Sequence, residues 1–511
     1  MSETSATGAK RGWLVLVFLA VYLLLSLFLF DPKPDIGGDN AVYLILGKAL
    51  ATGQGLTDIH LLDSPAQTQY PPLFPAILAL LYLLGGGTSV LAAKVLVVLF
   101  GLGAMYFTWR VLRHLLHDRA WVVMPVVVTT PLLITANHAV LSEIPFLCLS
   151  MAAVLFLLRA GPSRRWAYWV GFVLSVASVM VRTAGIGLVL AVALYLLLRR
   201  EYRLLALFAL LFLAVMVPWQ LRNARVGEAQ PYLARLLARD PYELAKGRVD
   251  LFCLFTRFWD NLALYAFGVL PQATIPLLRP GVWSIVVGLL LSGLAVLGAA
   301  TRVRRMSLLE SYALFGAAVF LFWPRVWGGE RFLLPLLPLI IMFIFSALAW
   351  VEERMKFRYL VLPVAVVLVA LNCVHLSGRI PAALRRNRAY LAGDRLAGYP
   401  PDWRRFFEAA EWLRENVDAD KVVMARKPEF VYLVAGLRTT IYPFTRDPVE
   451  VRAAIDRCDY VLFDNFKWTG ATERYLEKPL YTERYRLLRS FETSPPKFYV
   501  VRVLKDEPDP R

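Results

Sequence analysis

The run WLVLVFLAVYLLLSLFLF, residues 13–30, decides the class of fold. It holds about 18 uncharged residues, which is enough to cross the hydrocarbon core of a bilayer as a helix. Lys10 and Arg11 precede it, and DPKPDIGGDN follows it without a small-residue cleavage site. We therefore expect an uncleaved first helix and a cytoplasmic N-terminus.

The composition of the whole chain is that of a membrane protein. Of its 511 residues, 58% are hydrophobic and 18% are charged, whereas soluble chains are roughly 45–50% apolar. The net charge of +18 suits anionic membrane lipids or a phosphorylated lipid substrate. A basic chain can also bind nucleic acid, but here the charge lies in loops that flank apolar segments, so we expect no nucleic-acid partner.

The four cysteines are far apart and form no CxxC pair, which predicts neither a disulfide framework nor a zinc site.

About eleven apolar segments are predicted to span the membrane as helices. They are 13–30, 88–110, 121–137, 143–158, 166–181, 183–198, 203–219, 281–300, 308–324, 332–350 and 359–376. Pro72–Leu84 is apolar but only about 13 residues long, which fits an interfacial or re-entrant piece better than a span. If it does not cross, all the dense basic clusters become cytoplasmic, as the positive-inside rule expects. These clusters lie at 110–119, 159–165, 199–203, 302–305 and 354–358.

This topology predicts two domains. Residues 1–376 form a helical membrane domain with two external loops, 31–87 and 220–280; the second contains amphipathic aromatic stretches suited to the membrane surface. Residues 377–511 form a small external α/β domain. Its predicted strands are KVVMA, TTIYP, DYVLF and FYVVRVL, at 421–425, 439–443, 459–463 and 498–504, and 402–416 has helical spacing.

Two carboxylates are candidate catalytic groups. Asp39 lies in GGDNAVYLILGKALATGQGL, residues 37–56, just after the first span and at the start of an amphipathic helix that is expected to rest at the membrane surface. Its alternative role is that of a helix N-cap. Glu143 lies in NHAVLSEIPF, residues 137–146, where a carboxylate embedded in apolar sequence is a functional candidate. The alternative is again a helix start, with Pro145 in the first turn. His138 is a secondary candidate.

Three cations interrupt apolar sequence on the same predicted face. Arg182 lies in VMVRTAG, Arg331 lies in WGGERFLLPLLP, and Lys94 lies near the external end of its span. A phosphate leaving group would supply the anionic partner that a buried arginine needs. The alternative for Arg182 is an internal salt bridge, with Glu143 as a partner. The alternative for Arg331 is an ion pair with Glu330, or a side chain that snorkels to the membrane interface. Two carboxylates and several cations beside apolar grooves fit a reaction that deprotonates a hydroxyl and releases a lipid phosphate.

Several motifs in this order resemble the C-type integral-membrane glycosyltransferases, in the branch of the protein O-mannosyltransferases and the aminoarabinose lipid A transferase. The motifs are GGDNAVYLILGKAL, YPPLFPAILALLYLLGG, SEIPF, VMVRTAG, VPWQLRN and GGERFLLPLLPLI, between residues 37 and 340. The tail EWLRENVDADKVVMARKPEFVYLVAGLRTTIYP is similar to extracytoplasmic domains of bacterial members. The chain departs from the pattern in two places: Asp39–Asn40 replaces the Asp-Glu pair of the mannosyltransferases, and YPPL replaces the frequent KPPL.

The resemblance implies a polyprenyl-phosphate-sugar donor and inverting transfer to an acceptor hydroxyl on the periplasmic or external face. It implies Asp39 as the general base, Glu143 as a second acidic residue that shapes the site, and Arg182 and Arg331, joined by Lys94, as ligands of the donor phosphate. Tyr70, Pro71, Pro72 and His138 are expected to line the substrate groove.

No cofactor is expected, and a divalent metal is possible but not indicated by any ligand cluster. The acceptor is expected to be a lipid, a glycan or a protein, as in lipopolysaccharide or glycan biosynthesis or protein glycosylation, and the expected location is a bacterial inner membrane. The alternative functions are a lipid-linked-sugar flippase or transporter and a non-catalytic cell-envelope assembly protein.

Overall fold

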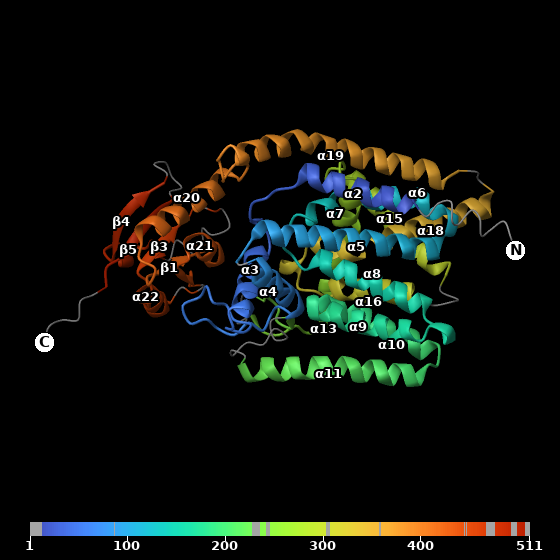
Figure 1. The fold of residues 1–511 in the computed structure, drawn as a ribbon, viewed down its shortest axis with the longest axis horizontal. Coiled ribbons are helices and arrows are strands. Elements are labelled where there is room, and N and C mark those ends of the chain that lie inside the picture. Colours follow the sequence, from blue (N-terminus) through green and yellow to red (C-terminus); the bar gives the residue numbers. More distant parts are fainter. Residues whose placement is uncertain are drawn as a thin grey trace. The chain divides into compact units, whose positions relative to one another are not determined.

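The computed structural model describes residues 13–85, 87–226, 236–241, 246–302, 307–356, 359–443, 445, 447–464, 466, 476–491 and 498–505. The chain forms two compact units (Figure 1). The membrane unit comprises residues up to 32, 68–74 and 90–385, and the α/β unit comprises 33–67, 75–89 and 386–511. The domain boundary predicted at residue 376 stays a prediction. Most of the loop 31–87, which was predicted to be external, belongs to the same compact unit as the C-terminal tail.

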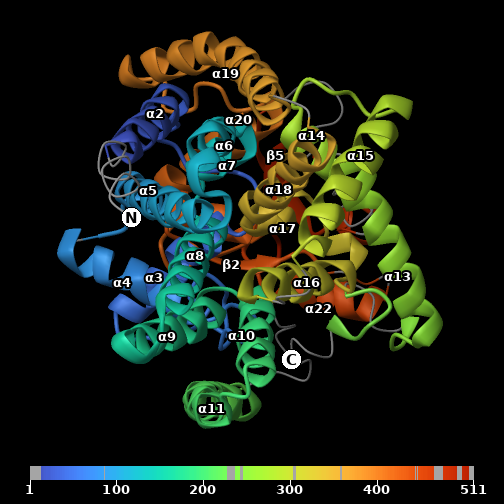
Figure 2. The same ribbon diagram turned by 90° about the vertical axis from the view of Figure 1, so that its right-hand side faces the viewer.

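The membrane unit is a bundle of helices. They are α2 Leu14–Leu29, α5 Val90–Leu116, α6 Ala120–Thr129, α7 Pro131–Ala136, α8 Glu143–Arg159, α9 Trp166–Val181, α10 Ile186–Leu198, α11 Tyr202–Val226, α13 Leu251–Ala263, α14 Leu270–Thr274, α15 Val282–Ala300, α16 Leu308–Leu321, α17 Glu330–Leu333, α18 Leu337–Met355 and α19 Val361–Leu391. Helix α8 packs between α5 and α9, and α18 lies at the centre of the bundle (Figure 2). Helix α11 lies at the periphery, and Phe208 is its one fully buried residue.

The apolar helices make the chain a multi-pass membrane protein, as predicted. Within the described residues, five segments are long and apolar enough to cross a bilayer: Val90–Thr129, Tyr202–Val226, Val282–Ala300, Glu330–Met355 and Val361–Leu391. Several other apolar helices are shorter, so the total of about eleven spans stays a prediction. Helix α19 continues 15 residues beyond the predicted end of the last span at 376, to Leu391.

Helix α13 lies within the stretch 220–280 that was predicted to rest on the membrane surface, and its exposed face is apolar, whereas polar side chains are buried. Its apolar side chains point outward, with Leu251 and Phe252 86% and 73% exposed. Its polar Arg257 and Asn261 are buried, and the Asn261 amide donates to the carbonyl of Leu321 over 2.9 Å. Such an outward apolar face is typical of a surface that lipid or a protein partner covers.

The α/β unit begins with α3 Asn40–Ala51 and includes most of α4 Leu73–Gly85. A helix of 13 residues rises only about 20 Å, less than the hydrocarbon thickness of about 30 Å, so the length of α4 agrees with the interfacial prediction.

The sheet of the α/β unit has the strand order β2-β1-β3-β5-β4. Its strands are β1 Val422–Ala425, β2 Arg438–Ile441, β3 Tyr460–Phe463, β4 Tyr485–Ser490 and β5 Tyr499–Val503, and its helices are α20 Pro401–Asn416, α21 Pro428–Ala435, α22 Pro448–Asp456 and α24 Pro479–Thr482. β1 pairs in parallel with β2 and β3, whereas β5 is antiparallel to β3 and β4. The four predicted strands and the helix at 402–416 are confirmed. β4 was missed because its residues are mostly exposed and lack the apolar alternation of a buried strand.

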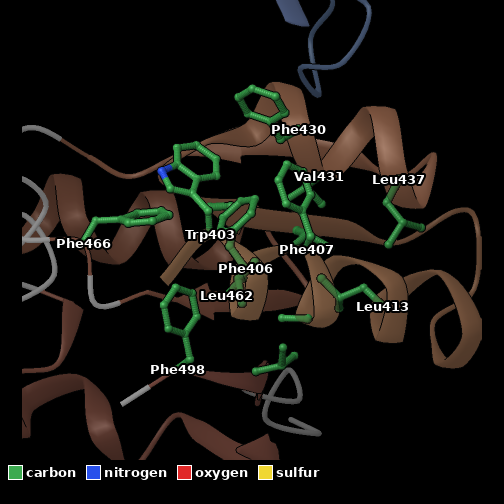
Figure 3. Packing of buried hydrophobic residues seen from close by; sticks show 14 of the residues in the cluster. Trp403, Phe406, Phe407, Leu413, Phe430, Val431, Leu437, Leu462, Phe466 and Phe498 are labelled. Carbon is green, nitrogen blue, oxygen red and sulfur yellow. The ribbon is translucent and has the colours of Figure 1, made fainter. Parts of the chain in front are cut away.

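Side chains alternate along each inner strand and build a core on both faces of the sheet. On one face, Val423 and Leu462 pack against an aromatic cluster that includes Trp403, Phe406 and Phe430 (Figure 3). The other face packs against α22. A strand buried on both faces requires the nearly continuous apolar sequence that β1 has.

Candidate functional site

Glu143, Arg182 and Arg331 meet in the membrane unit. Glu143 is the first residue of α8, and its side chain is 2% exposed. Its Oε1 accepts a hydrogen bond from Arg331 Nε over 2.7 Å and lies 3.1 Å from Arg182 Nη1. A buried carboxylate requires such ionic and hydrogen-bonded partners. We call these three residues the charge cluster.

Arg182 is held in place by the turn that ends α9. It is the C-cap residue with an extended backbone, and its Nη1 also donates to Ser142 Oγ over 3.0 Å. Its guanidinium carbon lies 5.1 Å from the centre of the Phe332 ring, in a cation–π contact. The internal salt bridge that was the alternative reading of Arg182 is therefore present.

Gly185 allows the motif VMVRTAG to fold back on α9. The amide of Gly185 donates to the carbonyl of Arg182 over 2.8 Å, within the short 3₁₀ helix Thr183–Gly185. A Cβ at this position would lie 2.6 Å from the backbone nitrogen of Val179. Only glycine fits this close backbone approach without a shift.

Arg331 lies on the single-turn helix α17, and its side chain is 34% exposed. The amide of Gly329, two residues earlier, donates to the hydroxyl of Tyr265 over 3.3 Å. Tyr265 belongs to a π-helical turn, Leu264–Val269, between α13 and α14. Such turns are frequent at functional sites. Tyr265 was not predicted from the sequence, because the aromatic stretch LALYAF, residues 262–267, is its only signal.

A narrow pocket lies beside Arg182. The residues that line it are Phe146, Arg182, Ala184, Tyr312, Gly316, Val319, Phe320, Phe332, Pro335 and Leu336. Apart from Arg182 and Tyr312, these side chains are apolar. The pocket therefore joins apolar walls to a guanidinium group.

Asp39 belongs to the α/β unit, at the N-terminus of α3. It follows Gly38, whose φ of +61° favours glycine. The turn is closed by the amide of Gly37, which donates to Asp35 Oδ1 over 2.7 Å, and by the side chain of Asn40, which donates to the carbonyl of Gly37. Asp39 occupies the N-cap position, but its side chain accepts no capping hydrogen bond from α3. The local fold thus places this carboxylate at a tight turn without using it as a side-chain cap.

The other predicted site residues lie in the membrane unit. Lys94 is buried on α5, and its Nζ donates to the carbonyl of Asp31 over 2.8 Å. His138 is buried and contacts the Phe30 ring edge-on, with ring centres 5.6 Å apart. Tyr70 and Pro72 are half-buried and Pro71 is buried, just before α4. In the part of the chain that the structure describes, no three His, Cys, Asp or Glu side chains gather as a metal site.

Comparison with solved structures confirms the predicted fold. The chain is similar to ArnT from Cupriavidus metallidurans bound to undecaprenyl phosphate, with a TM-score of 0.58 and 14% identity over 96% of this chain and 98% of ArnT. It is also similar to the Archaeoglobus fulgidus oligosaccharyltransferase tethered to an acceptor peptide, with a TM-score of 0.58 and 14% identity over 97% of this chain and 74% of that one. A mycobacterial arabinofuranosyltransferase, AftD, matches with a TM-score of 0.50 and 16% identity, over 97% of this chain and 40% of AftD. The fold is that of the C-type integral-membrane glycosyltransferases.

A family match in sequence agrees with this class. Residues 69–221 match the family described as dolichyl-phosphate-mannose-protein mannosyltransferase. The matched segment includes Glu143 and Arg182. A comparison with curated proteins gives no match. The resemblance predicted from the sequence motifs is thereby confirmed.

Proposed function

We propose that the chain is a glycosyltransferase that moves a sugar from a polyprenyl-phosphate donor to an acceptor hydroxyl, with inversion at the anomeric carbon. The reaction takes place on the non-cytoplasmic face of the membrane, in a bacterial host the periplasmic face of the inner membrane. The acceptor is a lipid, a glycan or a protein.

The charge cluster is the observation that carries this proposal. Arg182 and Arg331 both contact the carboxylate of Glu143, and the side chain of Arg331 is the more exposed of the two. Two guanidinium groups that lie close together suit a phosphate, which such groups bind through paired hydrogen bonds. The binding of undecaprenyl phosphate by the structurally similar ArnT gives further support.

The proposed chemistry assigns one role to each group. The acceptor oxygen attacks the anomeric carbon while the bond from that carbon to the phosphate oxygen breaks. The acceptor proton passes to the carboxylate of Asp39, which acts as general base. The polyprenyl phosphate leaves with one more negative charge than it had in the donor, and Arg182 and Arg331 stabilise that charge. Glu143 orients the two arginines, and Lys94 adds positive charge to the donor side. Tyr70, Pro71, Pro72 and His138 line the groove for the substrates.

A reconstituted transfer assay tests the proposal. Proteoliposomes receive a radiolabelled polyprenyl-phosphate sugar and a membrane extract as the acceptor pool, and both transfer and release of polyprenyl phosphate are measured. Asp39→Asn is expected to lower the rate at least about 100-fold, as for loss of a general base. Asp35→Asn is the matched control, because Asp35 is a carboxylate of the same turn that already accepts the Gly37 amide.

Equal activity of wild type and Asp39→Asn would move the base to another group, and Glu143 would be tested next. Bound donor without any release of polyprenyl phosphate in the wild type would contradict the proposed activity. That result would favour a transporter or a non-catalytic assembly protein.

A further inference from the structure

The loop that carries Asp39 is attached to the edge of the C-terminal sheet. Thr439 of β2 donates its amide to the carbonyl of His60 over 2.8 Å, and its hydroxyl donates to the same carbonyl over 2.7 Å. The amide of Leu62 donates in turn to the carbonyl of Thr439 over 2.9 Å. Residues 60–62 thus extend the sheet beyond β2 as a short parallel addition. Thr439 is fully buried, so these bonds form in a protected environment.

Helix α3, whose N-terminus is Asp39, packs against α21 of the C-terminal domain. Ile45 and Ala49 of α3 form an apolar cluster with Tyr432 and Leu433 of α21. The ammonium group of Lys48 lies 4.8 Å from the centre of the Tyr432 ring, which adds a cation–π contact. The apolar face of α3, which the sequence predicted to rest on the membrane surface, is in large part covered by protein.

The chain is also fixed on both sides of Asp39. On the N-terminal side, the hydroxyl of Tyr399 donates to the carbonyl of Pro34 over 2.7 Å, and Ile36 packs against the aromatic cluster shown in Figure 3. On the C-terminal side, Ala41 is a buried member of the same cluster. Asp39 therefore sits between two anchor points, Ile36 and Ala41, that both depend on residues 386–511.

These contacts assign a role to the C-terminal domain. We infer that residues 386–511 are the scaffold that positions Asp39 for catalysis, and that Thr439 and Tyr399 are positioning residues of the transferase. The inference rests on the proposed function of Asp39 as general base. Its first physical basis is geometric, because a displacement of about 1 Å in a catalytic group can lower a rate about 100-fold. Its second basis is entropic: a loop without anchor points would lose conformational entropy each time it became ordered for the reaction.

The sequence of β2 provides a matched set of variants. Thr439→Val removes the hydroxyl that bonds to His60 but keeps shape and volume, and Thr439→Ser retains the hydroxyl. Thr440→Val is the control, because among the described residues the buried Thr440 hydroxyl has no hydrogen-bond partner. Tyr399→Phe removes the hydrogen bond to the carbonyl of Pro34, on the N-terminal side of Asp39.

Hydrogen exchange of the full-length protein in nanodiscs and steady-state transfer kinetics together test the inference. In Thr439→Val and Tyr399→Phe we expect faster exchange of amides in 36–62 and a kcat about 10-fold lower, with the KM for the donor within about 2-fold of wild type. Thr439→Ser should restore both readouts, and Thr440→Val should match the wild type. An unchanged KM shows that donor binding is intact. Because partial unfolding would also lower the apparent kcat, rates are normalised to the folded fraction of each variant.

Two results would overturn the inference. One is faster exchange of 36–62 without any fall in kcat, because Asp39 would then not depend on its anchors. The other is an equal loss in Thr440→Val, because the effect would then be one of strand stability. Failure of the proposed function is distinguishable from both: the wild type would transfer no sugar, although Thr439→Val and Thr440→Val would still differ in exchange.

Discussion

Arg331 and Glu143 are 188 residues apart in sequence, but Arg331 Nε donates to Glu143 Oε1 over 2.7 Å. The carboxylate is 2% exposed, whereas the arginine side chain is 34% exposed. The pair thus joins a buried structural anion to a cation that a ligand can reach. Arg182 completes the cluster from the buried side, with 13% exposure. The two arginines are therefore expected to respond differently to mutation.

Arg331→Gln is expected to lower kcat/KM for the donor by about 10- to 100-fold, because a hydrogen bond to a charged group contributes about 1.5–3 kcal/mol. Arg331→Lys should retain part of the activity, since it keeps the charge but loses the fork geometry. The control is Arg325→Gln, because Arg325 is 66% exposed and pairs with Asp260. A comparable loss in the control would attribute the effect to surface charge.

Arg182→Gln is expected to destabilise the protein by about 3 kcal/mol, because breaking a buried ion pair leaves the buried carboxylate poorly compensated. The double variant Arg182→Gln/Glu143→Gln should recover much of the loss, which thermal unfolding in detergent would measure as a double-mutant cycle. Strictly additive losses would show that Arg182 and Glu143 do not depend on each other.

Gly185→Ala is expected to destabilise the protein by about 1–3 kcal/mol, as overpacking does, because the new Cβ would lie 2.6 Å from the backbone of Val179. The displaced turn also carries Arg182, so donor binding should weaken. Gly293→Ala in α15 is the control, since a Cβ there meets nothing within 4 Å. Unchanged melting temperature and donor affinity in Gly185→Ala would refute the role given to this turn.

The stability of the α/β unit is expected to depend on pH through His60. The imidazole is 5% exposed, and burial lowers its pKa from 6.5 to about 4. Between these values the unfolded chain binds a proton that the folded chain does not, so the free energy of unfolding falls as the pH falls from 6.5 to 4, by up to about 3 kcal/mol. Chemical denaturation at pH 7 and 4.5 would measure this slope. His60→Gln should reduce it, and a variant with an unchanged slope would assign it to other groups.

Much of the secondary structure was predictable because it depends on residues that are close together in the sequence. The apolar runs predicted a multi-pass helical protein, and short β-branched segments such as 421–425 predicted the strands of the C-terminal sheet. Strand β4 escaped prediction because Leu487 and Leu488 are adjacent and partly exposed, so its sequence has no alternating pattern. The candidate residues were predictable for a similar reason: a charge within apolar sequence stands out at Glu143, Arg182 and Arg331.

The sequence by itself determined which residues are buried in lipid or protein, and which charges are costly enough to need a partner. Hydropathy and periodicity are local properties, so they carry this information without knowledge of the fold. Only the tertiary structure decided that Arg182 and Arg331 share one oxygen of Glu143, and that Thr439 binds His60 across 379 residues of sequence. Such contacts depend on the way in which whole helices and sheet edges pack against one another. The entropy of closing a long loop changes little with its length, so distance along the chain does not identify the partner.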